Sequence, residues 1–119
     1  MKCAVLLIPA TAALFLSTAT ANAGNTYDGS WSLQFITQKG GCDPSYNFDV
    51  NVANGVVTHP NLVRFKGYVA NSGTVRASVT VMDKFAAGSG KLTRTSGHGT
   101  WSGYSGPARC SGYWVAQRS

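Results

Sequence analysis

The chain has 119 residues and carries ten Lys and Arg against four Asp and no Glu, a formal net charge of +6. This length fits one domain and excludes an enzyme built from separate cofactor and substrate domains. Fourteen glycines and a charged fraction of 12% predict a turn-rich β protein rather than a helical or disordered chain.

The first 23 residues have the three parts of a secretory signal peptide. Lys2 gives a positive start, residues 3–16 are almost wholly apolar, and Ala21-Asn22-Ala23 is a small-x-small cleavage site. The apolar run falls short of the roughly 20 residues that a membrane-spanning helix needs, so we expect cleavage rather than anchoring. Its short, Ala-rich character is typical of bacterial leaders. The sequence therefore predicts export to the periplasm or the medium and a single β domain over residues 24–119.

Beyond the leader, apolar and polar side chains alternate almost everywhere, which is the pattern of half-buried β-strands. Trp31, Leu33 and Phe35, for example, alternate with polar neighbours, and Asn54-Gly55 predicts a type I′ hairpin turn. No window longer than a turn has the 3.6-residue period of a helix. The predicted strands are residues 27–37, 46–52, 56–58, 62–69, 74–82, 85–95, 99–104 and 110–117.

The order of these strands and the two cysteines of the mature chain predict a barrel. Sequential antiparallel strands lose their edges by closing into a cylinder. Cys42 and Cys110 remain after Cys3 leaves with the leader, and one such pair in an exported domain predicts a disulfide. Cys42 follows the first strand and Cys110 begins the eighth, positions that barrel closure brings together. We expect an all-β antiparallel meander of about eight strands, closed or nearly closed, with a β-sandwich as the alternative.

The two ends of the mature chain carry a known pattern. The chain opens with Asp28-Gly29-Ser30-Trp31 and ends with Trp114-Val115-Ala116-Gln117-Arg118. A Gly-x-Trp on the first strand and a basic residue closing the last strand resemble the calycin superfamily of lipocalins, avidins and small bacterial metalloprotease inhibitors. The resemblance implies that Arg118 covers the Trp31 ring and plugs one barrel end, a cation–π contact of about 0.5–2 kcal/mol.

A second pattern runs through nearly the whole mature chain. It is the succession Gly-x-Trp, Gly-x-Cys-Asp, Asn-Gly-x-Val, Ser-Gly-x-Gly-Thr-Trp and Cys-Ser-Gly-x-Trp-x-Ala-x-Arg. This succession is similar to a group of small secreted bacterial β-rich proteins that has no assigned activity. The likeness agrees with export and carries over no functional residue.

The acidic and histidine side chains are too few and too scattered to predict an active site. Asp43 and Asp83 fall in turns, and Asp49 falls on the polar face of the second strand. A glycosidase needs two carboxylates that face each other across a cleft, and the spacing marks no such pair. His59 and His98 fall in separate predicted loops, whereas a zinc site needs three or four converging ligands. We therefore expect no catalysis, no metal and no cofactor.

Two sets of surface side chains are candidates for binding. The first is a basic stripe on the outward faces of neighbouring strands, either solvated surface or a site for an envelope polyanion such as lipopolysaccharide or acidic polysaccharide. The second is an aromatic contact surface, although its tryptophan also suits the core. The basic residues are Arg64, Lys66, Arg76, Lys91 and Arg94, and the aromatic residues are Tyr68, Trp101 and Tyr104.

These features favour an exported, non-catalytic binding or interaction protein of the bacterial envelope, with no membrane span in the mature chain. Its expected partner is an envelope polyanion or a protein, and export argues against nucleic acid. A minor hydrolase would need Asp49 or Asp83 beside His59 or His98 in a pocket, and two further alternatives stay open. One is a small protease-inhibitor barrel whose N-terminal segment, residues 24–28, projects into a target cleft. The other is polyanion binding through the basic stripe.

Overall fold

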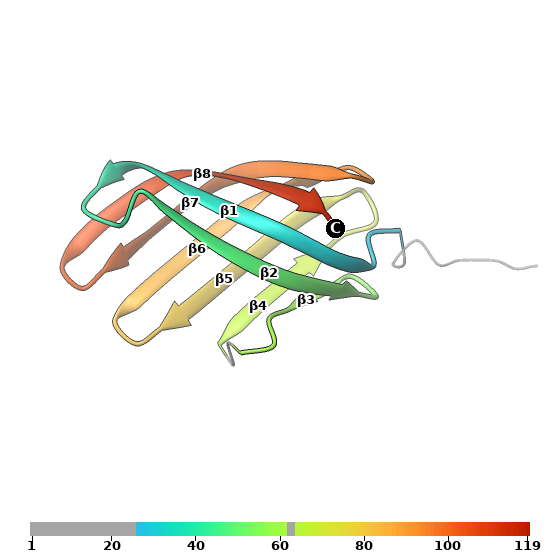
Figure 1. The fold of residues 1–119 in the computed structure, drawn as a ribbon, viewed down its shortest axis with the longest axis horizontal. Helices are drawn as coiled ribbons and strands as arrows, with labels where there is room; N and C mark the ends of the chain where they lie inside the picture. Colours follow the sequence, from blue (N-terminus) through green and yellow to red (C-terminus); the bar gives the residue numbers. More distant parts are fainter. Residues whose placement is uncertain (1–25, 62–63) are drawn as a thin grey trace, which may run out of the picture.

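Eight antiparallel strands close into a barrel in the computed structural model, which describes residues 26–61 and 64–119 (Figure 1). Each strand pairs with its neighbours in the sequence, and β1 pairs with β8. The predicted barrel is therefore confirmed in place of the sandwich. The strands are β1 Gly29–Gly40, β2 Ser45–Ala53, β3 Val56–Thr58, β4 Phe65–Val69, β5 Thr74–Val81, β6 Lys84–Leu92, β7 Ser96–Ser105 and β8 Ala108–Arg118.

One predicted segment and part of another lie outside the described residues. They are the signal peptide of residues 1–23 and two members of the predicted fourth strand, Leu62 and Val63. Among the residues that the structure does describe, no helix is long and apolar enough to cross a membrane.

The two-residue alternation separates the barrel interior from its outer surface. In β1, Trp31 and Phe35 are buried while Ser32 and Gln34 are exposed. Cross-strand partners point to the same side of a sheet, and Trp31 accordingly lies opposite buried Val50 of β2. The same alternation continues around the cylinder, so the inward side chains of all strands share one core.

The turn between β2 and β3 is the one predicted from the sequence, whereas the boundary between the sixth and seventh strands differs from the prediction. Asn54 and Gly55 between β2 and β3 have φ angles of 52° and 79°, the two positive values that a type I′ turn requires. The sixth strand ends at Leu92 rather than at Thr95, because the Thr93 amide donates to the Ser96 carbonyl at 2.7 Å and turns the chain. The seventh strand consequently begins earlier than predicted.

Closure between the first and last strands is covalently reinforced. Gly40 at the end of β1 lies opposite Cys110 in β8. Cys42, two residues further on, forms the disulfide with Cys110, with a Cα–Cα distance of 5.9 Å. The predicted Cys42–Cys110 bond is confirmed. A shift of register between Thr37 and Lys39 bends β1 near this end.

Glycines in β6 and β7 make room for a tryptophan from β8. Gly90, Gly99 and Trp114 are successive cross-strand partners. A Cβ atom on Gly99 would lie 2.5 Å from Trp114 Nε1, and one on Gly90 would lie 2.6 Å from Trp114 Cζ2. These glycines, which weaken the strand pattern in the sequence, therefore permit the indole to lie against the sheet.

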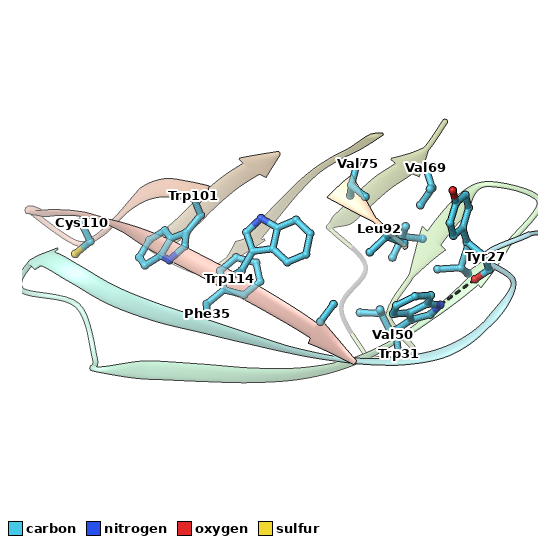
Figure 2. Close-up of a cluster of buried hydrophobic side chains, with 13 residues drawn as sticks. Tyr27, Trp31, Phe35, Val50, Val69, Val75, Leu92, Trp101, Cys110 and Trp114 are labelled. Atoms are coloured by element: carbon cyan, nitrogen blue, oxygen red, sulfur yellow. Dashed lines mark hydrogen bonds between the residues drawn. The ribbon is translucent and has the colours of Figure 1, made fainter. Parts of the chain in front are cut away.

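The three tryptophans are spaced along the barrel interior. Figure 2 shows Trp101 toward Cys110, Trp31 beside Tyr27 at the opposite end, and Trp114 between them. Each indole N–H donates to a backbone carbonyl: Trp31 to Tyr27 at 2.9 Å, Trp101 to Ile36 at 3.1 Å and Trp114 to Ser89 at 3.2 Å. Buried indoles need such partners, and here they fix the three rings in place.

Candidate binding site at the open end of the barrel

One end of the barrel is plugged by Arg118. Its guanidinium carbon lies 5.4 Å from the centroid of the Trp31 ring, and Trp31 is 2% exposed. The same guanidinium donates to the carbonyls of Thr26 at 3.1 Å, Arg94 at 2.9 Å and Asp28. The pair that the calycin resemblance implies is thus in contact and lies beside the first described residues.

The middle of the barrel is filled. An apolar void of about 40 Å³ remains among side chains that include Trp31, Leu33, Phe35 and Trp114. A void of this kind stays dry because it offers water no hydrogen-bonding partner. The described part of the interior therefore leaves no space for a ligand buried deep in the barrel.

The other end of the barrel is hollow. A cavity of about 350 Å³, here called the mouth, lies at the end that carries the disulfide and the β5–β6 and β7–β8 turns (left in Figure 1). Apolar side chains dominate its lining, and its size is at the lower end of the range for small-molecule sites. The mouth is lined by Phe35, Cys42, Tyr46, Phe48, Val79, Val81, Lys84, Phe85, Ala86, Trp101 and Tyr104.

A layer of aromatic rings forms the floor of the mouth. The Phe35 ring centroid lies 5.6 Å from that of Phe48 in an edge-on arrangement and 5.9 Å from that of Trp101. Phe35 borders both the inner void and the mouth, so its ring separates them. On the outer side of the rim, the Phe85 and Tyr104 rings stack with a centroid distance of 5.6 Å.

Lys84 supplies the charge of this lining. It begins β6 and pairs with Val81, an inward position of β5. The Lys84 residue is exposed, so its ammonium group can stay hydrated while its methylene stem lies along the apolar wall. This arrangement suits a ligand with an apolar body and an anionic or polar end near the rim.

The acidic residues considered from the sequence are dispersed. Asp49 Oδ1 accepts from the Ser32 hydroxyl at 3.2 Å on the outer surface, and Asp83 lies in the exposed β5–β6 turn. Asp43 lies in the β1–β2 loop, where its carbonyl accepts from the Thr37 hydroxyl at 2.5 Å. None of these contacts joins two carboxylates.

The histidines are equally separate. His59 Nδ1 accepts from the Asn61 amide at 3.0 Å, and its ring lies beside Phe48 and Phe65. His98 is an exposed residue of β7 and not a loop residue, because β7 begins at Ser96. Within residues 26–61 and 64–119, no group of three or more His, Cys, Asp or Glu is placed to hold a metal ion.

The predicted basic stripe is only partly assembled. Lys66 and Arg76 border one outer hollow, Lys91 pairs with Thr74 on the same face, and Arg64 precedes β4 opposite Thr80. Arg94 is not on a strand face. It lies in the β6–β7 turn at the plugged end, where its carbonyl accepts from Arg118.

The predicted aromatic surface is wrong for its tryptophan. Trp101 is 5% exposed, points inward from β7 and forms part of the floor of the mouth. Tyr104 is 40% exposed at the rim, and Tyr68 is 63% exposed on the outside of β4. The three residues therefore contribute to different surfaces rather than to one.

Sequence reasoning did not identify the mouth. Comparisons of the chain with protein-family models, curated proteins and solved structures found no match. Chemically, the mouth offers mainly aromatic and aliphatic contact, with Lys84 as the charged residue of its lining. Such a set is suited to contact with an apolar group.

Proposed function

We propose that this chain is an exported, non-catalytic binding protein of the bacterial envelope that holds the apolar part of a small molecule in its mouth. The observation that carries the proposal is the apolar cavity of about 350 Å³ at the end of the barrel opposite the Arg118 plug. An open apolar cavity with a few polar groups is the usual form of a ligand site.

The contact area is sufficient for a modest affinity. An aromatic ring system that buries about 150–250 Å² gains about 4–6 kcal/mol at 25 cal/mol per Å², before the cost of association. The filled interior beyond Phe35 limits how deeply a ligand inserts. We therefore expect ring-sized groups or short chains to bind better than long, fully buried chains.

The location in the envelope rests on the disulfide and the predicted leader. A bond between Cys42 and Cys110 forms and persists in oxidising compartments such as the periplasm or the medium. The inhibitor alternative has less support, because the described part of its proposed arm is packed against the barrel. Tyr27 is 8% exposed, and the carbonyls of Thr26 and Asp28 are bound by Arg118.

The test is a titration with N-phenyl-1-naphthylamine, an uncharged apolar fluorophore, using the oxidised mature protein. Ala86 points into the mouth, whereas its neighbour Ala87 lines the outside of the same strand. Ala86→Trp fills the mouth and Ala87→Trp leaves it open. We expect saturable fluorescence enhancement with the wild type and with A87W, and its loss with A86W.

Val81→Trp provides a second blocking variant in the mouth and guards against an effect specific to position 86. Circular dichroism before and after reduction checks that each variant retains the barrel. Equal binding by the wild type, A86W and V81W would refute the mouth as the site.

A further inference from the structure

A second hollow lies on the outer surface of the barrel, over β4 to β7. Its volume is about 590 Å³. Outward residues of β4 and β5, Lys66, Tyr68 and Arg76, border it, and small side chains of β6 and β7 continue the lining, including Ser89, Thr100 and Ser102. The small side chains of β6 and β7 project only a short distance from the sheet. The longer side chains of Lys66, Tyr68 and Arg76 therefore form one side of the hollow.

The strand register arranges this outer hollow in two rows. Tyr68, Arg76, Ser89 and Thr100 are successive cross-strand partners. Lys66 belongs to the adjacent row, opposite Ser78. Lys66 and Arg76 are therefore diagonal neighbours, about 7–8 Å apart at the backbone, which is within reach of one anionic group or two adjacent ones.

The charge of the outer hollow is uncompensated. The four acidic side chains of the chain lie elsewhere: Asp28 before β1, Asp43 in the β1–β2 loop, Asp49 on β2 and Asp83 in the β5–β6 turn. Two like charges without an acidic neighbour repel each other, and an anion bound between them relieves this repulsion.

We propose that the outer hollow binds an acidic saccharide. Lys66 and Arg76 would bind its carboxylate, sulfate or phosphate oxygens, and the hydroxyls of Ser89, Thr100 and Ser102 would exchange hydrogen bonds with sugar hydroxyls. Tyr68, 63% exposed at the border, offers a flat face to a sugar ring.

The outer hollow fits single-stranded nucleic acid, the alternative polyanion, less well than it fits an acidic saccharide. Such sites stack successive bases on several aromatic side chains, and Tyr68 is the exposed aromatic residue of this lining. The saccharide proposal does not depend on the proposed function, because the outer hollow and the mouth lie on opposite sides of β6.

The experiment is calorimetric titration of the oxidised mature protein with alginate oligosaccharides, dextran sulfate and a phosphorylated mannan, with neutral dextran and oligothymidylate as comparisons. We expect binding to at least one anionic glycan, weakening with salt, and none to neutral dextran. The three glycans distinguish carboxylate, sulfate and phosphate as the recognised group.

The variant K66Q/R76Q should weaken glycan binding about tenfold or more, because it removes two positive charges and the charge-assisted hydrogen bonds they would donate to the glycan. The control K39Q/R109Q removes the same charge from residues outside the hollow and should change affinity less than about twofold. A87W should also weaken glycan binding, whereas A86W should not. Y68A should weaken it without changing its salt dependence.

Three results would overturn the saccharide proposal. They are no binding to any of the anionic glycans, equal losses in K66Q/R76Q and K39Q/R109Q, and tighter binding of oligothymidylate than of every glycan. Each leaves the mouth proposal intact, because that proposal is tested by an uncharged fluorophore and by position 86.

Discussion

The guanidinium of Arg118 lies over the ring of Trp31, with its carbon 5.4 Å from the ring centroid. The same group binds carbonyls before β1 and in the β6–β7 turn. One side chain thus links the last strand to the segment before the first strand and to the β6–β7 turn. This contact makes the barrel asymmetric, with a plugged end and an apolar mouth.

Arg118→Ala should destabilise the protein by about 2 kcal/mol, because it removes a cation–π contact and several charge-assisted hydrogen bonds. Arg118→Lys should recover less than half of this loss, since an ammonium group cannot reproduce the planar guanidinium fork. Urea unfolding of the oxidised proteins measures both effects. Unchanged midpoints for R118A would show that the plug does not contribute to stability.

The disulfide should contribute about 4 kcal/mol to the free energy of unfolding, because it closes a long loop in the unfolded chain. The double variant C42A/C110A removes it, and its stability is compared with that of reduced wild-type protein by urea unfolding. The two should agree closely. A loss below about 1 kcal/mol in both would contradict the loop-closure explanation.

Gly99→Ala should destabilise the barrel by about 3 kcal/mol or more, as overpacking of a filled core does. The added Cβ would lie 2.1 Å from the Ser89 carbonyl oxygen and 2.5 Å from Trp114 Nε1. The neighbouring outward residue provides the control: His98→Ala should change stability by less than about 0.5 kcal/mol. Thermal unfolding of both variants decides the matter, and similar melting temperatures for both would refute the role given to Gly99.

Lys84 should discriminate between ligands by charge. Lys84→Gln should weaken binding of the anionic fluorophore 1-anilinonaphthalene-8-sulfonate about two- to fivefold, as expected for an exposed ion pair. Binding of uncharged N-phenyl-1-naphthylamine should stay the same. If both fluorophores lose affinity equally, Lys84 acts through packing and not through its charge.

The fold was predictable because two signals act over short distances. The alternation around Trp31 and Phe35 marks the buried face of a strand, and Asn54-Gly55 specifies its own turn. The positions of Cys42 and Cys110 then constrain how the strands close. The position of β7 was harder to predict, because its inward glycines carry no apolar signal and make sense only beside Trp114.

The two proposed sites were not predictable as cavities. The mouth exists because Phe35, Phe48 and Trp101 meet at one depth while Ala86 leaves space above them, which depends on the register of several strands. The outer hollow likewise requires Arg76 and Ser89 to be cross-strand partners. Residue types indicated basic and aromatic candidates, but the depth and register that assemble a site are properties of the closed barrel.

The most direct test of binding at the mouth uses the three indole N–H signals in a ¹H–¹⁵N NMR spectrum. Trp101 lies at the floor of the mouth, Trp114 lies in the middle and Trp31 lies under the plug. On titration with N-phenyl-1-naphthylamine, the Trp101 signal should shift most and the Trp31 signal should stay in place. A fluorophore that binds without moving the Trp101 signal, or that moves the Trp31 signal most, would contradict the proposed site.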